Sequence, residues 1–139
     1  MDTVAFWDFD GTLVHSGPLW SSSVYQALKE TEPDTQVLFV DIRKHMAYGF
    51  TWHTPDEDHR CLTGDRWWDF MNRHFYNTYI KLGVDEDAAR IAAGKVHNII
   101  KKKENYSLYG DTLQVLHQLK NNGVKMFCSL IIIRTWRKF

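Results

Sequence analysis

Apolar residues gather near the two ends of the chain in short runs. The first run covers residues 3–7 and is followed at once by Asp8, Asp10 and Gly11. An apolar run that stops at turn-forming residues is typical of a buried strand in a parallel sheet. A second run, at residues 124–129, has the same character. The pattern therefore predicts one strand near each end of the chain.

Between these runs, apolar residues recur at the spacing of an amphipathic helix. Four segments show this spacing: residues 19–31, 65–82, 85–100 and 111–123. Asp65, Asp85 and Asp111 stand at the start of the last three segments and are expected to cap those helices. Residues 50–63 have no clear period, which predicts a long loop.

The segment between residues 36 and 48 admits two interpretations. Residues 37–40 have the composition of a short strand. Asp41 can instead cap a helix that ends at Tyr48, with Gly49 just beyond it. We favour the helix. The order of elements is then strand, helical insertion, helix, strand, which predicts an α/β fold with a parallel pair of strands joined by a crossover.

The composition is that of a soluble globular protein. Hydrophobic residues make up 44% of the chain and charged residues 24%, with 17 basic side chains against 17 acidic ones. A net charge of zero argues against nucleic acid or an anionic membrane as a partner. Cys61 and Cys128 form no disulfide or metal-binding pattern. We expect a cytoplasmic protein with neither a signal peptide nor a membrane span.

Asp8 and Asp10 lie two positions apart, directly after the first predicted strand. Ligands of parallel α/β sheets bind beyond the carboxyl ends of the strands, so both carboxylates stand where a substrate is expected. Asp8 can attack phosphorus to form an aspartyl-phosphate, while Asp10 acts as acid and then as base. A magnesium ion is expected, because it prefers oxygen ligands and offsets the repulsion between nucleophile and phosphate. The alternative is that Asp and Gly serve here only as turn formers.

The sequence Trp7-Asp8-Phe9-Asp10-Gly11-Thr12-Leu13 resembles the first motif of the haloacid dehalogenase-like hydrolase superfamily. The acid at position 10 resembles the phosphatase branch, phosphoglycolate phosphatase-like proteins among them, rather than the dehalogenases. The resemblance implies that Gly11, Thr12 and Ser129 bind the substrate phosphate. It also implies that the Asp8 side chain and the Asp10 backbone carbonyl bind magnesium.

The same resemblance implies a domain layout. Residues 17–107 resemble the family's helical cap, while residues 1–16 and 108–139 resemble the start of its Rossmann-like parallel sheet domain. The family's later lysine and later acidic pair cannot be placed in this sequence. After Ser129 the chain departs abruptly from the family pattern, with the residues Leu-Ile-Ile-Ile-Arg-Thr-Trp-Arg-Lys-Phe. We therefore expect an incomplete catalytic domain with a C-terminally truncated or frameshifted tail.

Together these features predict a magnesium-dependent phosphatase acting on a small phosphorylated metabolite, with activity impaired by the missing motifs. The alternative is a non-catalytic fragment whose helical cap serves as an interaction module or has no function. An exposed apolar strand after Ser129 is expected to favour self-association through a sheet edge. Neither nucleic acid nor a membrane is expected as a partner.

The loop at residues 50–63 holds a second group of candidate metal ligands. These are His53, Asp56, Asp58 and His59. No pair among them has the spacing of a known zinc motif, which favours a solvated loop over a metal site. Arg43, Trp52 and His53 are alternative candidates for substrate recognition.

Aromatic residues crowd one face of the helix predicted at residues 65–82. This face carries Trp67, Trp68, Phe70, Met71, Phe75 and Tyr79. Such a stripe indicates packing between helices in the first place. A stacking surface for a substrate, or an interface with a partner, is the second interpretation.

Overall fold

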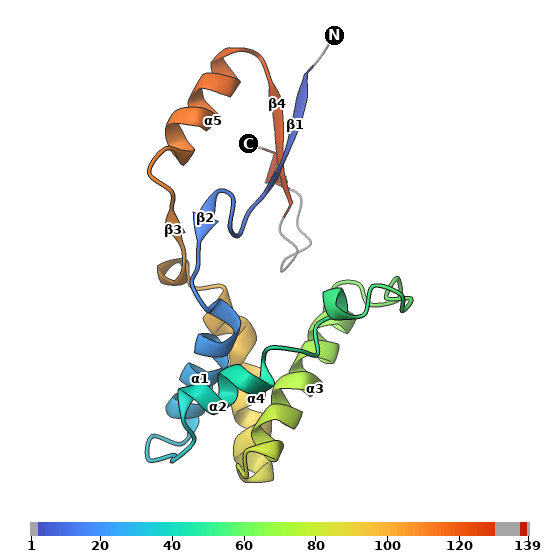
Figure 1. The fold of residues 1–139 in the computed structure, drawn as a ribbon, viewed down its shortest axis with the longest axis vertical. Coiled ribbons are helices and arrows are strands. Elements are labelled where there is room, and N and C mark those ends of the chain that lie inside the picture. The colour runs from blue at the N-terminus through green and yellow to red at the C-terminus, as the bar shows by residue number, and fades with distance from the viewer. Residues whose placement is uncertain (1–2, 130–136, 139) are drawn as a thin grey trace. The chain divides into compact units, whose positions relative to one another are not determined.

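The protein is described by a computed structural model, which covers residues 3–129 and 137–138 (Figure 1). The chain divides into two compact units. The α/β unit comprises Met1–Gly17 and Lys103–Phe139, and the helical unit comprises Pro18–Lys102. The sequence-based bounds of the insertion were 17–107. Residues after Lys102 fall in the α/β unit because they include a strand, β3 (Ser107–Leu108), that pairs within it.

A small sheet forms the centre of the α/β unit. Strand β1 (Val4–Asp8) pairs in parallel with β4 (Lys125–Ser129), and helix α5 (Thr112–Asn121) leads into β4. Strand β5 (Arg137–Lys138) pairs with β4 in the antiparallel direction, which gives the order β1-β4-β5. The parallel pair and its crossover confirm the α/β prediction, and the sheet is consistent with part of a Rossmann-like domain. The short strand β5 was not predicted.

The two faces of this sheet differ in burial. Trp7 is half-buried and packs against a small core, whereas Phe6 on the opposite face of β1 is 71% exposed. The Phe6 ring stacks on that of Phe127, its partner in register, with the ring centroids 5.4 Å apart. The core itself consists of Leu13, Val14 and Cys128, with Trp7, Phe9, Tyr106 and Leu116 packed against it.

A second, two-stranded sheet joins the segments that precede and follow the helical unit in sequence. Strand β2 (Val14–His15) pairs with β3 in the antiparallel direction, with Val14 opposite Leu108. The sequence did not predict either strand, because two residues carry no readable periodicity. Their pairing depends on segments more than ninety positions apart.

The helical unit contains four α-helices and a short 3-10 turn. These are α1 (Leu19–Thr31), α2 (Phe39–His45), η1 (Thr51–His53), α3 (Asp65–Lys81) and α4 (Glu86–Ile100), and a further turn η2 (Lys103–Asn105) follows in the α/β unit. Helix α4 packs against both α1 and α3. Phe75 and Tyr79 of α3 are fully buried, and the Tyr79 hydroxyl donates a 2.7 Å hydrogen bond to the Val24 carbonyl. The aromatic face of α3 therefore packs mainly in the core, as its spacing predicted.

The ends of three helices test the predicted caps. Asp85 caps α4, because its side chain accepts hydrogen bonds from the amides of Asp87 and Ala88. Asp111 precedes α5, but its side chain makes no capping bond. The prediction for Asp65 was wrong, since α3 begins at this residue and Gly64 occupies the cap position. Asp65 instead places a negative charge in the first turn, where the helix dipole favours it.

The helical interpretation of residues 36–48 is confirmed, but α2 starts earlier than predicted and ends at His45 rather than Tyr48. Helix α2 begins at Phe39, so Asp41 lies in its first turn rather than at its cap. Its carboxylate accepts a 3.0 Å hydrogen bond from the Lys44 side chain one turn later. No strand forms at residues 37–40.

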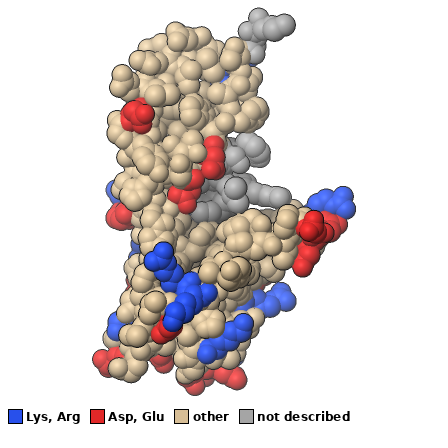
Figure 2. All heavy atoms as spheres, in the orientation of Figure 1, with Lys and Arg blue, Asp and Glu red and all other residues tan. Residues whose placement is uncertain are grey.

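Charged side chains of both signs are interspersed over the visible face of the helical unit, whereas the visible face of the α/β unit carries fewer of them (Figure 2). This mixture agrees with the balance of 17 basic and 17 acidic residues. Among the described residues, no helix is both long enough and apolar enough to cross a membrane.

Candidate active site

Asp8 and Ser129 lie side by side at the carboxyl ends of neighbouring parallel strands. Asp8 is the last residue of β1, Ser129 is the last residue of β4, and the two are partners in register. The Asp8 side chain is exposed, and its Oδ1 accepts a 2.9 Å hydrogen bond from the amide of Phe9. The backbone thus places both positions at the sheet edge where ligands of α/β folds bind.

The loop after Asp8 is a tight turn held by its own backbone. The amides of Leu13 and Val14 both donate 3.0 Å hydrogen bonds to the Phe9 carbonyl. The Gly11 amide donates to the Val14 carbonyl at 2.8 Å, and Gly11 has a φ of 84°. Such a positive φ is the region that glycine adopts at least cost, which explains glycine at this position. The Gly11 amide is therefore already used by the turn.

Helix α5 fixes the far side of the same loop. The Thr112 hydroxyl donates a 2.9 Å hydrogen bond to the Leu13 carbonyl, and the Tyr109 amide donates to the same oxygen at 3.3 Å. Thr112 and Leu13 are both buried. The sequence analysis missed Thr112, because a threonine in the first turn of a helix has no visible connection with a loop near the other end of the chain.

Asp10 is held by a residue that the sequence analysis also missed. The Ser16 hydroxyl donates a 2.6 Å hydrogen bond to Asp10 Oδ1. Asp10 is exposed. Burial of the nearby Tyr106 hydroxyl raises its pKa, and the negative charge of Asp10 raises it further. The available sequence signal was a serine six positions after the aspartate, which by itself is too common to identify a partner.

The predicted site residues can now be placed. Asp8 is the exposed last residue of β1, with the backbone of Ser129 beside it, and Asp10, Gly11 and Thr12 follow on the exposed loop. Within the described part of the chain, the amide and hydroxyl of Thr12 form no hydrogen bond. The side chain of Ser129 and the tail at residues 130–136 lie outside the described residues, so the predicted phosphate contact and apolar strand stay predictions.

The side-chain and backbone oxygens of Asp8 and Asp10 are of the type that binds magnesium. Two exposed carboxylates and a backbone carbonyl are oxygen donors, and magnesium commonly binds one or two protein carboxylates and keeps several waters. In the described ranges, no group of three or more His, Cys, Asp or Glu residues is arranged to hold a metal. Asp8 and Asp10 can therefore supply part of a magnesium site.

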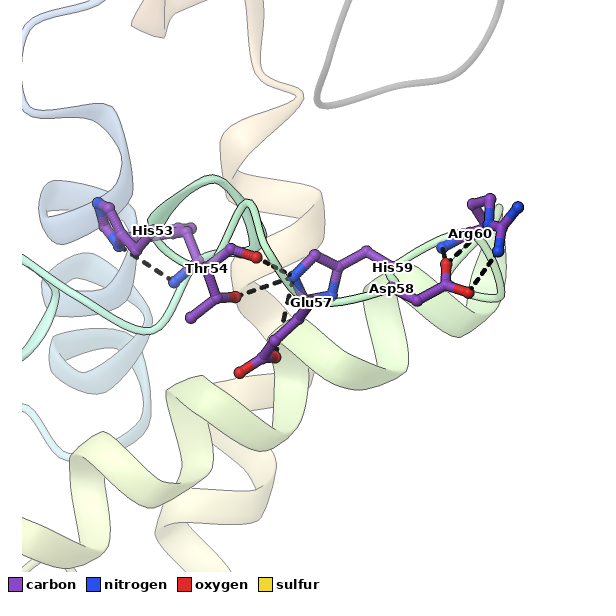
Figure 3. A network of polar contacts seen from close by, with 7 residues as sticks. His53, Thr54, Glu57, Asp58, His59 and Arg60 are labelled. Atoms are coloured by element: carbon purple, nitrogen blue, oxygen red, sulfur yellow. Dashed lines mark hydrogen bonds and ion pairs between the residues drawn. The ribbon is translucent and has the colours of Figure 1, made fainter.

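In the second candidate metal site, in the loop at residues 50–63, the side chains of Asp58 and His59 contact other residues of the loop (Figure 3). His59 Nε2 lies 2.8 Å from the Thr54 hydroxyl and 2.9 Å from the Thr54 carbonyl. Asp58 binds Arg60 through both carboxylate oxygens, at 2.9 and 2.8 Å. These contacts favour the solvated loop over the metal site.

The residues considered for substrate recognition lie in the helical unit. Arg43 and His53 are exposed, and Trp52 is 45% exposed while its ring stacks on Phe50 at a centroid distance of 4.3 Å. Trp52 and Phe50 both lie near Trp20, which also contacts rings of α3. Substrate recognition by Arg43, Trp52 and His53 stays a prediction.

Comparison with known proteins identifies the family. The family model of haloacid dehalogenase-like hydrolases matches residues 3–133, which is most of the 139-residue chain. No curated protein and no solved structure gives a match. The match includes both strands of the parallel pair and the loop that carries Asp8 and Asp10. The chain belongs to the haloacid dehalogenase-like hydrolases.

Proposed function

We propose that this chain is a magnesium-dependent phosphatase of small phosphate monoesters, with the helical unit as its cap. The observation that carries this proposal is the pairing of Asp8 with Ser129 at the carboxyl ends of β1 and β4, with Asp10 two residues after Asp8. An aspartate at both positions supplies a nucleophile and an acid within one loop.

Asp8 is the nucleophile in this proposal. One of its carboxylate oxygens accepts a hydrogen bond from the Phe9 amide. This bond orients the carboxylate and leaves its other oxygen to attack phosphorus. The new bond joins Asp8 to phosphorus, and the bond from phosphorus to the ester oxygen breaks. Asp10 donates a proton to that leaving oxygen, and then accepts a proton from the water that hydrolyses the aspartyl-phosphate.

Thr12 and Ser129 are the expected donors to the substrate phosphate. The Gly11 amide is committed to the Val14 carbonyl, so Gly11 contributes the shape of the turn rather than a donor. Thr12 is exposed and has both its amide and its hydroxyl available within the described part of the chain. A magnesium ion bound by the Asp8 carboxylate and the Asp10 carbonyl would neutralise part of the phosphate charge.

Phosphoryl transfer depends chiefly on the electrostatic stabilisation of the transferring group. Among the described residues of the loop, Thr12 would supply this stabilisation together with the metal. The proposed substrate is a small phosphorylated metabolite. The proposed location is the cytoplasm, where the free cysteines Cys61 and Cys128 would stay reduced.

The test is hydrolysis of an aryl phosphate by the purified chain, with and without magnesium. We expect magnesium-dependent turnover that is lost in Asp8→Asn and strongly reduced in Asp10→Asn. Asp69→Asn is the matched control, because Asp69 is an exposed carboxylate on α3 in the other unit. A folded wild-type chain with no turnover above Asp8→Asn would overturn the proposal and leave the non-catalytic alternative.

A further inference from the structure

The helical unit contains a short segment that is attached to the helices through one buried side chain. Residues 47–53 follow α2, and Phe50 in the middle of this segment is only 4% exposed. The Phe50 ring packs edge-on against Trp20 of α1, with the ring centroids 5.1 Å apart, and lies 5.6 Å from the ring of His74 on α3. All of these residues belong to one compact unit. The attachment of the segment therefore involves an ionisable ring.

The backbone of Gly49 lies directly on the imidazole of His74. A Cβ added to Gly49 would stand 2.4 Å from His74 Cε1 and 2.7 Å from His74 Nδ1, which is closer than side chains allow. Gly49 also has a φ of 93°, a left-handed conformation that favours glycine. The His74 ring forms a hydrogen bond with the Tyr48 backbone as well. The segment thus rests on this ring at two successive residues.

The His74 ring lies where a positive charge is unfavourable. Its Nε2 is buried and has no hydrogen-bond partner within the described residues. The charged groups that face it are Lys81 of α3, His45 of α2 and His53 of η1, each of them positive when protonated. Burial, and then the charge of Lys81, lower the pKa of His74. A charged His74 carries a proton on Nε2, which would be a buried donor without an acceptor, next to other cations.

A second histidine holds the same segment by accepting a hydrogen bond. The Phe50 amide donates to His53 Nδ1 at 3.4 Å, and the His53 amide donates to the Phe50 carbonyl at 3.0 Å. A ring nitrogen accepts only while it carries no proton, so the first of these bonds requires a neutral His53. Both histidines therefore hold the segment in place in their neutral forms, and both oppose this arrangement when charged.

We propose that residues 47–53 form a pH-sensitive switch segment, which is closed against α3 while His53 and His74 are neutral and opens when they are protonated. Opening would expose the Phe50 ring and the part of Trp20 that it covers. Helices α3 and α4 keep their mutual packing in both states, because the segment is not part of that contact. The proposal concerns the helical unit alone and does not depend on phosphatase activity.

Amide hydrogen exchange of the whole chain, measured by NMR at several pH values, tests the proposal. Dividing the intrinsic rate at each pH by the observed rate gives the protection of each amide. Protection of the His53 amide should fall below about pH 6.5, the ordinary pKa of histidine, and the loss should approach about tenfold per pH unit, the limit for one proton taken up on opening. Protection of the α4 amides should fall far less. Constant protection of the His53 amide, or equal losses at His53 and in α4, would overturn the proposal.

Gly49→Ala should open the segment without a change of pH. The added Cβ collides with the His74 ring, so this variant should show at neutral pH the low His53 protection that the wild type shows in mild acid. Gly83→Ala is the matched control in the same unit, because Gly83 has a φ of 79° but a Cβ there meets nothing within 4 Å. It adds the backbone strain without the collision and should keep the wild-type protection of the His53 amide. Equal protection in the two variants would contradict the proposed contact.

His74→Asn tests the role of the buried ring. It should weaken the pH dependence of His53 protection, because asparagine takes up no proton. His97→Asn is the control, since His97 stacks on Trp68 at a centroid distance of 3.7 Å in the same unit, and it should leave the pH dependence unchanged. The proposal is overturned if His74→Asn shows the same pH dependence as the wild type.

Discussion

The Thr112 hydroxyl donates a buried 2.9 Å hydrogen bond to the Leu13 carbonyl, across 99 positions of sequence. The first turn of α5 is thereby attached to the loop that carries Asp8 and Asp10. This contact, the Tyr109 amide and the pairing of Val14 with Leu108 connect the loop to the rest of the α/β unit.

Replacing Thr112 with valine should destabilise the α/β unit by about 1 kcal/mol, the net value of one buried hydrogen bond. The loss stays near this value because the Tyr109 amide still donates to the Leu13 carbonyl. Native-state hydrogen exchange of the β1 and β4 amides measures the effect in this unit. Thr112→Ser keeps the hydroxyl and should retain most of the stability; equal losses in both variants would contradict the role of the hydrogen bond.

Removing the hydroxyl of Ser16 should lower turnover by about three- to tenfold. This effect is smaller than that of losing a buried hydrogen bond to a charged group, because Asp10 is exposed. The physical reason is that Asp10 loses the 2.6 Å bond that orients it for proton transfer. Steady-state kinetics of Ser16→Ala should show the change in kcat with KM little altered. Ser107→Ala, an exposed serine of β3, should match the wild type.

Gly11→Ala should destabilise the α/β unit by about 1–2 kcal/mol, the cost of a left-handed conformation for a residue with a Cβ. The cost lies in the backbone alone, since a Cβ at Gly11 meets nothing within 4 Å and φ is 84°. Gly110→Ala is the control, because its Cβ also meets nothing and its φ is not positive. The same hydrogen-exchange measurement should separate the two variants, and similar stabilities would show that the turn tolerates alanine.

The helical unit should lose stability as the pH falls below about 6.5, the ordinary pKa of histidine. Burial, and then the charge of Lys81, lower the pKa of His74, although a hydrogen bond with the Tyr48 backbone opposes this. Burial also lowers the pKa of His97. Because the unfolded chain then binds more protons than the folded one, stability is full above the unfolded pKa and is lost as the pH falls toward the folded value.

Urea denaturation followed by far-UV circular dichroism at several pH values checks this dependence. His74→Asn should flatten this dependence. A wild-type stability that does not fall between pH 7.5 and pH 5, bounds of about one unit or more on each side of that pKa, would contradict the prediction.

We propose that the protein self-associates through the exposed edge of its sheet, and we expect Phe6→Ser to reduce this association. Phe6 is 71% exposed on the outer face of β1, and β1 is the terminal strand in the order β1-β4-β5. An apolar face beside an unpaired strand edge favours pairing with a second copy. Sedimentation velocity over a range of concentrations measures the effect. Leu108→Ser, at a side chain that is 52% exposed in the same unit, should change association less; an equal reduction would point to a general loss of apolar surface.

Much of the fold follows from local sequence. The first strand, its Asp8-to-Gly11 loop and helices α3 and α4 all lie within a residue or two of the predicted positions. Their signals are local: an apolar run, turn-forming residues and helical periodicity need no knowledge of distant segments. Asp85 was found as a cap for the same reason, because its partners are the next two or three amides.

The connections of the site were decided by the tertiary structure. Strands β2 and β3 and the bond from Thr112 to Leu13 depend on segments far apart in the chain. Such contacts produce no periodic pattern in the sequence, because each involves a single residue of a common type in each of the two segments. The sequence by itself therefore determined which carboxylates stand after β1, through local turn chemistry. Only the tertiary structure decided which neighbours hold them, since long-range packing selects those partners.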